Sequence, residues 1–311
     1  MISLGKNMKK MMAFLFVTTI IFCACTAPQT PTPTPTQTFI QTQVQMSTPT
    51  PTYIPSSTGD YLVDVGGYRL HFRVYPGSEP AILLESGGGA DASYWDNLAP
   101  VLSRKTGATI ITYDRAGYGE SDLPDTPYDI RKEISGLWRG LEQLRLTNSL
   151  IVLGHSYGGM LIRVLANEHP QAIRGMVFLD AMNVEFIDAI GGVEALINHP
   201  LSQHFDRSQI EQLTKPQRAA LRVEAGLPDS VSLLRTLFIP INIPVRVITA
   251  GIPWWPKPEE NQYWWESHEH LATSVKDGKL LVAEHSDHFV PDKQPEIIVD
   301  VLEELVQAAR K

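Results

Sequence analysis

The chain has 311 residues, of which 43% are hydrophobic and 19% are charged. This composition is typical of a soluble globular protein and argues against a disordered or multispanning membrane protein. The formal net charge is −8 and no Lys/Arg-rich block occurs, which excludes an extended nucleic-acid-binding surface. The only cysteines are Cys23 and Cys25, so the rest of the chain can hold no disulfide and no cysteine-ligated metal.

The N-terminal stretch MKKMMAFLFVTTIIFCAC has two lysines and then a largely apolar run. The run is short for a spanning helix, which needs about 20 residues, and is typical of an export signal. The small Ala24 before Cys25 predicts bacterial lipoprotein cleavage, with residues 1–24 as signal peptide and Cys25 as the lipidated first residue. We therefore expect a cell-envelope lipoprotein held at the membrane only by its N-terminal lipid. A retained anchor or ordinary secretion are the alternatives.

Residues 25–58 are rich in proline and threonine and carry no charge. Such a segment cannot bury a core and is expected to be extended, with polyproline character. It is interpreted as a tether that holds residues 59–311 away from a surface, or as a tail with no spacing role.

Strand and helix patterns alternate along residues 59–311. The stretch YLVDVGGYRLHFRVY predicts two strands that meet at Gly66 and Gly67. Six further strands are predicted at 81–85, 108–113, 149–153, 176–179, 245–249 and 279–283, and helices at 128–144, 157–168, 259–274 and 295–309. This alternation indicates an α/β protein with a mostly parallel sheet covered by helices on both faces. Residues 181–243 show helical pieces without a strand pattern and are predicted to form a cap over the strand ends.

Ser156 stands between a predicted strand and a predicted helix, in LIVLGHSYGG. A nucleophile in such a tight turn needs small residues two positions before and after it, and Gly154 and Gly158 occupy those positions. The backbone N–H of Tyr157, at the start of the helix, can then bind a developing oxyanion. The sequence therefore predicts Ser156 as a nucleophile; a plain glycine-rich strand–helix turn is the alternative.

Five segments, in this order, resemble the α/β-hydrolase family: LLESGGGADASYW, YDRAGYGESD, GHSYGG, VFLDA and SDHFVPDKQPEII. The resemblance runs from Tyr61 to the C-terminus. It implies an α/β-hydrolase fold and a triad in the chain order serine, acid, histidine. Because the nucleophile is serine, relatives that open epoxides or haloalkanes with a carboxylate are disfavoured.

The histidine that matches this order is His288, in the loop between the last strand and the terminal helix. His285 is a competitor, although it stands closer to the strand end. His268 and His270 are interpreted as exposed helix residues. No third ligand supports a metal site, so none is expected.

The resemblance implies that the acid follows one of two strands. Asp180 stands directly at the end of the earlier strand, whereas the loop after the later strand has no acid until Glu259. Asp180 is therefore the preferred acid, which would orient His288. In the alternative, Asp180 only caps the next helix and Glu259 or Glu260 is the acid.

The second oxyanion donor is expected from the loop LLESGGG, in which Gly88 is the best match and Gly89 its neighbour. The family's usual His-Gly pair is replaced here by Ser86-Gly87. Asp114 and Arg115, in the following motif, are expected to make structural polar contacts.

These features predict a serine hydrolase that cleaves a carboxylic ester or a similar small acyl substrate, without metal or organic cofactor. A lactonase, thioesterase, amidase, carbon–carbon bond hydrolase or cofactor-free perhydrolase could use the same triad. A surface-tethered binding protein that keeps the fold without turnover is the alternative of another class. The sequence leaves the oligomeric state open.

Overall fold

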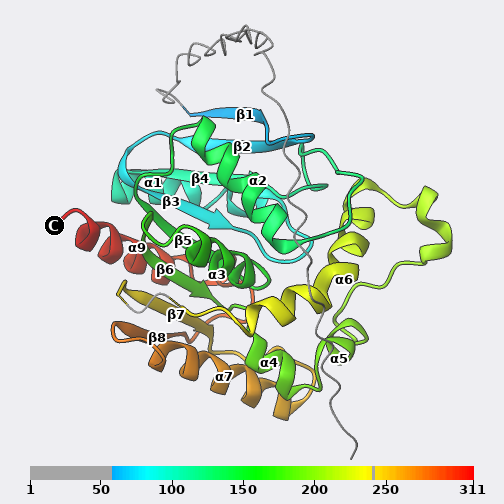
Figure 1. The fold of residues 1–311 in the computed structure, drawn as a ribbon. Helices are drawn as coiled ribbons and strands as arrows, with labels where there is room; N and C mark the ends of the chain where they lie inside the picture. The colour runs from blue at the N-terminus through cyan, green and yellow to red at the C-terminus, as the bar shows by residue number, and fades with distance from the viewer. Residues whose placement is uncertain (1–57, 240–241) are drawn as a thin grey trace, which may run out of the picture. The chain divides into compact units, whose positions relative to one another are not determined.

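An eight-stranded sheet forms the centre of the computed structural model, which describes residues 58–239 and 242–311 (Figure 1). The predicted signal peptide, the lipidated Cys25 and nearly all of the tether lie outside these residues. Within the described ranges, no helix is long and apolar enough to cross a membrane.

The strand order in the sheet is β1-β2-β4-β3-β5-β6-β7-β8. β1 and β2 pair antiparallel, β2 pairs antiparallel with β4, and all other neighbours are parallel. The strands are β1 (Gly59–Asp64), β2 (Arg69–Tyr75), β3 (Ser78–Glu85), β4 (Ala108–Asp114), β5 (Leu150–His155), β6 (Ile173–Leu179), β7 (Val245–Ala250) and β8 (Gly278–Ala283). The predicted opening hairpin and all six predicted later strands are confirmed.

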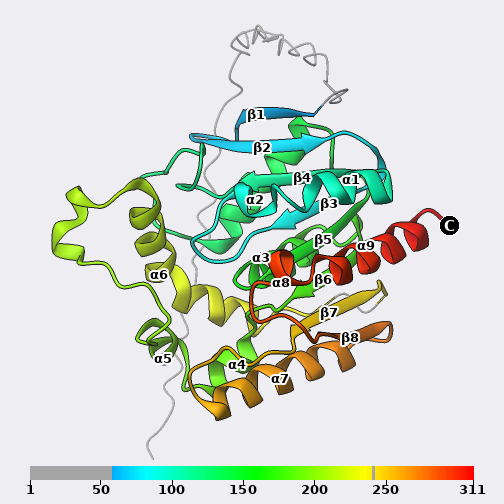
Figure 2. The same cartoon turned by 180° about the vertical axis from the view of Figure 1, so that it is seen from behind.

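Helices cover both faces of the sheet. α2 (Ile130–Gln143) and α3 (Gly158–Glu168) lie on the face seen in Figure 1, and α1 (Ala99–Thr106) and α9 (Pro295–Ala309) lie on the face seen in Figure 2. Along α9 the buried residues recur every three or four positions, which places one apolar stripe against the sheet. α7 (Pro258–Thr273) packs beside β7 and β8. The four predicted helices are confirmed, and α1 is an additional one.

The segment between β6 and β7 is helical, as predicted. Its described residues contain α4 (Val184–Ala189), α5 (Val193–Ile197), the short 3₁₀ helix η2 (Arg207–Gln212) and α6 (Lys215–Leu234). We call residues 181–243 the cap segment. α5 and α6 project from the side of the sheet at which the parallel strands end (Figures 1 and 2). The described residues also include two short helices, η1 (Ala92–Trp95) and α8 (Val290–Lys293).

Candidate active site

Ser156 lies in the turn between β5 and α3, with a backbone φ of 52°. This left-handed conformation is strained for a non-glycine residue and occurs mainly where the surrounding structure enforces it. A Cβ added at Gly154 would lie 2.5 Å from the Gly158 carbonyl oxygen, and one added at Gly158 would lie 2.7 Å from the Glu85 carbonyl oxygen. The turn is therefore as tight as the glycine spacing predicts.

Asp180 and His288 meet at the ends of β6 and of the loop after β8. The His288 Nδ1–H donates to Asp180 Oδ2 at 2.7 Å, and Asp180 Oδ1 accepts from the Ala250 N–H at 2.9 Å and from the Trp264 Nε1–H at 2.8 Å. Asp180 is fully buried. Burial raises the pKa of Asp180, but the hydrogen bond and charge of His288, together with His268 and the Ala250 N–H, outweigh burial and lower this pKa to about 2. The acid is thus a carboxylate that fixes the imidazole and leaves its Nε2 free for a proton.

The two alternative acids do not contact His288. Glu259 is exposed. Glu260 is buried, and its carboxylate binds Lys257 Nζ at 2.7 Å and His199 Nε2 at 3.3 Å. His285, the competing histidine, is exposed and lies outside the residues that line the cavity described below.

The prediction that His268 is exposed was wrong: its side chain is fully buried. His268 follows Trp264 by four residues and precedes Leu271 by three, so all three share the face of α7 that packs on the sheet. The His268 Nε2–H donates to the Ala181 carbonyl at 2.9 Å, directly beside the acid. His270 is exposed, as expected.

Ser156 and His288 line one cavity of about 580 Å³. Gly88, Tyr157, Trp254 and other residues of the sheet edge form one part of its wall. Most of the remaining wall is apolar. It comes from Met160 of α3 and from residues of the cap segment: Met182, Leu196, Ile197, Leu201, Ala220, Val223 and Leu227. Within the described ranges, no group of three or more His, Cys, Asp or Glu side chains could hold a metal ion.

Gly88 and Tyr157 lie next to each other at the base of this cavity. A Cβ added at Gly88 would lie 3.8 Å from Tyr157 Cβ, and one added at Gly87 would lie 3.2 Å from Ser156 Cβ. Tyr157 is at the N-terminal end of α3, where backbone N–H groups have no acceptor within the helix and carry partial positive charge. The two expected oxyanion donors are therefore brought to the same place as Ser156.

Arg115 holds the loop that carries Gly88. Its buried guanidinium pairs with Glu85 at 2.8 Å and donates to the carbonyls of Ser86 at 2.6 Å, Gly87 at 2.5 Å and Ala90 at 3.3 Å. The structural polar contacts expected for Arg115 thus go mainly to the backbone of this loop.

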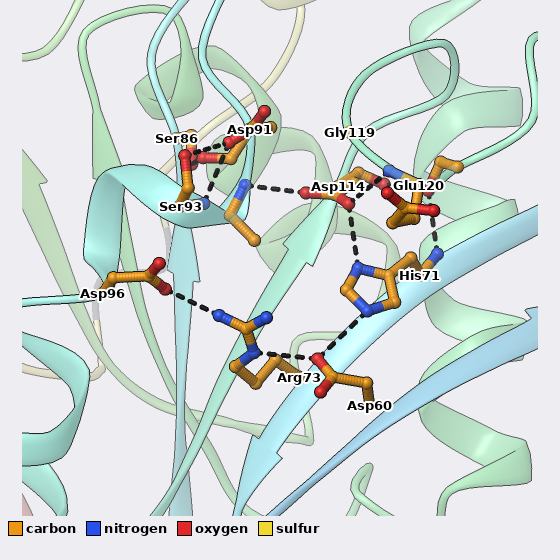
Figure 3. Close-up of polar contacts among 12 residues, drawn as sticks. Asp60, His71, Arg73, Ser86, Asp91, Ser93, Asp96, Asp114, Gly119 and Glu120 are labelled. Carbon is orange, nitrogen blue, oxygen red and sulfur yellow. Dashed lines mark hydrogen bonds and ion pairs between the residues drawn. The ribbon is translucent and has the colours of Figure 1, made fainter.

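Ser86 and Asp114 connect the same loop to the sheet. Ser86 Oγ accepts from Trp95 Nε1 at 2.8 Å. The Asp114 carboxylate accepts from the backbone N–H groups of Ala92 and Glu120 and from His71 Nδ1, each at 2.8 Å (Figure 3). The hydrogen bond to Asp114 raises the pKa of His71.

Three aromatic contacts of the site were not predicted. Trp264 donates to the acid, Trp254 stacks on the His288 ring with centroids 4.1 Å apart, and the His155 ring lies 4.6 Å from the His288 ring. The sequence places Trp254 in the loop after β7, and this was the only sign that it could lie near the site. Contacts between rings of distant segments cannot be predicted from spacing along the chain.

The sequence and the fold of this chain are similar to those of known proteins. A family model described as "alpha/beta hydrolase fold" matches residues 80–225. An uncharacterized protein of Mycobacterium tuberculosis is 32% identical over 120 residues, which cover 39% of this chain and 34% of that protein. An sn-1-specific diacylglycerol lipase of Mus musculus is 27% identical over 184 residues, 55% of this chain and 57% of the relative.

The chain thus matches between about a third and three fifths of the length of these two relatives. Among solved structures, a thermophilic esterase from Thermogutta terrifontis has a TM-score of 0.56 at 19% identity, and the match covers 82% of this chain and 100% of the esterase. The sheet order, the strand–serine–helix turn and these likenesses together show that the chain has the alpha/beta hydrolase fold.

Proposed function

We propose that the chain is a serine hydrolase that cleaves a carboxylic ester or a similar acyl bond with Ser156, His288 and Asp180. The observation that carries this proposal is the part-buried 2.7 Å hydrogen bond between Asp180 and His288 beside the cavity that Ser156 lines. Because the Nδ1–H of His288 donates to Asp180, Nε2 is the ring nitrogen that acts as the base in this proposal.

In the proposed reaction, His288 Nε2 takes the Ser156 hydroxyl proton while Ser156 Oγ attacks the substrate carbonyl. The N–H groups of Tyr157 and Gly88 hold the oxyanion. His288 then gives its proton to the leaving alkoxide, and the acyl group stays on Ser156. Water, deprotonated by His288, attacks this acyl-enzyme, and return of the proton to Ser156 Oγ releases the carboxylic acid.

The cavity favours apolar acyl or alcohol groups of moderate size, because its volume is about 580 Å³ and its cap-segment wall is mostly apolar. The likeness to a protein named as a lipase supports an ester bond. A lactone, thioester, amide or peracid reaction would use the same residues, and hydrolysis rates on matched substrates of each type would separate them.

The test is labelling of the full chain, solubilised in detergent, with a fluorophosphonate probe, followed by mass spectrometry. We expect an adduct on Ser156 that Ser156→Ala abolishes. Ser202→Ala is the matched control, because it removes another serine hydroxyl that lines the same cavity and leaves labelling intact. A folded chain that takes no label would favour the non-catalytic binding protein instead.

We further propose that Cys25 is lipidated and holds the protein at the cell envelope. Its support is the sequence pattern alone. Metabolic labelling with a fatty-acid analogue should mark the wild-type chain and not Cys25→Ser. Label retained in that variant would place the lipid elsewhere.

A further inference from the structure

His155 is the residue immediately before Ser156, and it holds His288 in two ways. Its Nε2–H donates to the His288 carbonyl oxygen at 2.9 Å. The two imidazole rings also lie 4.6 Å apart with an interplanar angle of 37°. The last residue of β5 therefore contacts both the main chain and the ring of a residue 133 positions later in the chain.

Trp254 supplies a second ring contact to His288. Its ring stacks on the imidazole at 4.1 Å and 24°. Tyr94 in turn stacks on His155 at 5.1 Å and 23°. Four rings thus follow one another in the order Tyr94, His155, His288 and Trp254.

We propose that His155 and Trp254 are positioning residues that hold the His288 imidazole at the place from which it reaches Ser156; this inference rests on the proposed function. Asp180 fixes only one edge of the ring, at Nδ1. His155 fixes the backbone of residue 288, and Trp254 limits movement of the ring out of its plane.

His155 is suited to this role because it stays uncharged. Burial and the neighbouring His288 hold the pKa of His155 down to about 3. The carbonyl of His288 can only accept, so the neutral ring carries its proton on Nε2. Its Nδ1 is buried and has no hydrogen-bond partner among the described residues. A neutral ring does not oppose the positive charge that His288 gains during attack on the substrate.

The same ring also contacts the oxyanion loop. A Cβ added at Gly87 would lie 2.9 Å from His155 Nδ1 and 3.2 Å from Ser156 Cβ. The nucleophile, the histidine loop and the loop before Gly88 therefore converge on His155, which links the positions of all three.

The test uses the full chain and separates the hydrogen bond from the ring. His155→Phe keeps a ring and loses the donor, whereas His155→Gln keeps an N–H near the position of Nε2. Trp254→Ala removes the second ring, and Trp254→Phe restores one. Each variant is scored by the rate constant for fluorophosphonate labelling of Ser156 and by kcat and KM on a p-nitrophenyl ester.

We expect His155→Phe and Trp254→Ala each to lower the labelling rate and kcat about tenfold, the equivalent of one well-made contact. His155→Gln and Trp254→Phe should each recover part of this loss. For the two His155 variants, KM should stay within about twofold of the wild-type value because neither change touches the substrate directly.

His71→Asn is the control for lost stability: His71 is also a buried histidine of the sheet, but it contacts Asp114 and Asp60. It should lower the melting temperature and leave labelling unchanged.

The outcomes are distinguishable. If the wild-type chain takes no label, the proposed function fails before the variants are compared. If the wild type is labelled and His155→Phe and Trp254→Ala react at its rate, the positioning role is wrong. If all variants, including His71→Asn, lose rate in proportion to stability, the contacts are only structural and the inference is also wrong.

Discussion

At the scale of single residues, the buried carboxylate of Asp180 holds His288 through the Nδ1 of its ring. Asp180 has no access to water, yet its carboxylate accepts hydrogen bonds from His288, Ala250 and Trp264, and a longer one of 3.5 Å from Thr249 Oγ1. A buried charge without such partners would instead be neutralised. The hydrogen bonds to Asp180 offset the cost of burying its charge, and the carboxylate in turn orients the His288 ring.

Replacing Asp180 should therefore lower kcat far more than replacing Glu260, the alternative acid. Asp180→Asn cannot accept the Nδ1 proton in the same way and should lower kcat by roughly 10²–10⁴. Glu260→Gln, an isosteric change at the other buried acid of this region, should leave kcat within about threefold. Steady-state kinetics on one ester decides between them. A larger loss in Glu260→Gln would overturn the choice of acid.

Trp264 should make a smaller contribution through the same carboxylate. Trp264→Phe keeps an aromatic ring in the core but removes the donor to Asp180 Oδ1, which is expected to cost about 0.5–1.5 kcal/mol. kcat should fall about three- to tenfold. Trp265→Phe is the neighbouring control, because Trp265 is 39% exposed. Equal kcat values for the two variants would contradict a role for the indole N–H.

At the scale of elements, the turn from β5 into α3 determines where Ser156 stands. The backbone of this turn has little room to move, because the first residues of α3 lie within van der Waals distance of β5 and of the loop after β3. The loop before Gly88 is confined as well, since the Arg115 guanidinium binds three of its carbonyls. The position of Tyr157 is thus set by main-chain packing, and that of Gly88 by the Arg115 side chain that binds its loop.

A methyl group in this turn should be poorly tolerated. Gly154→Ala places Cβ 2.5 Å from the backbone carbonyl oxygen of Gly158, which cannot rotate away, and should cost about 1–3 kcal/mol of unfolding free energy. Gly175→Ala, in the adjacent strand β6, places Cβ 3.4 Å from the flexible end of Leu305 and 3.6 Å from the Pro244 carbonyl oxygen, both ordinary contacts or close to it, and should cost much less unfolding free energy. Urea denaturation measures both. Equal losses of unfolding free energy in the two variants would contradict the tight turn between β5 and α3.

At the scale of the whole molecule, two buried histidines make stability depend on pH. Burial lowers the pKa of both His155 and His268, so below about pH 6.5 the unfolded chain binds protons that the folded chain does not. Unfolding free energy must then fall as pH falls through this range. His71 affects the unfolding free energy in the opposite direction, because its pKa is raised in the folded chain. Its stabilising contribution is fully present below pH 6.5 and is lost as the pH rises through this raised pKa.

Denaturation curves between pH 6.5 and 5 should show this slope. A single histidine contributes at most about 1.4 kcal/mol per pH unit. His155→Gln should remove its share of the slope, whereas His71→Asn should leave the slope in this range unchanged. Parallel curves for the wild type and His155→Gln would show that His155 takes up a proton in the folded state.

The sequence by itself determined what depends on neighbours along the chain. Strand and helix patterns are local, so the alternation that builds the sheet was predicted, and so was the cap segment without strands. The glycines around Ser156 are also local, because the collision they avoid lies within one turn. α1 was missed because eight residues give too short a pattern for a helical period.

Only the tertiary structure decided which distant groups meet. Asp180 and His288 are 108 residues apart, and the contact depends on how β6 and β7 align and where the loop after β8 returns. The burial of His268 and the ring contacts of His155 and Trp254 with His288 depend on the same packing. Spacing along a chain fixes directions within one element, whereas distances between elements follow from the packing of the whole sheet.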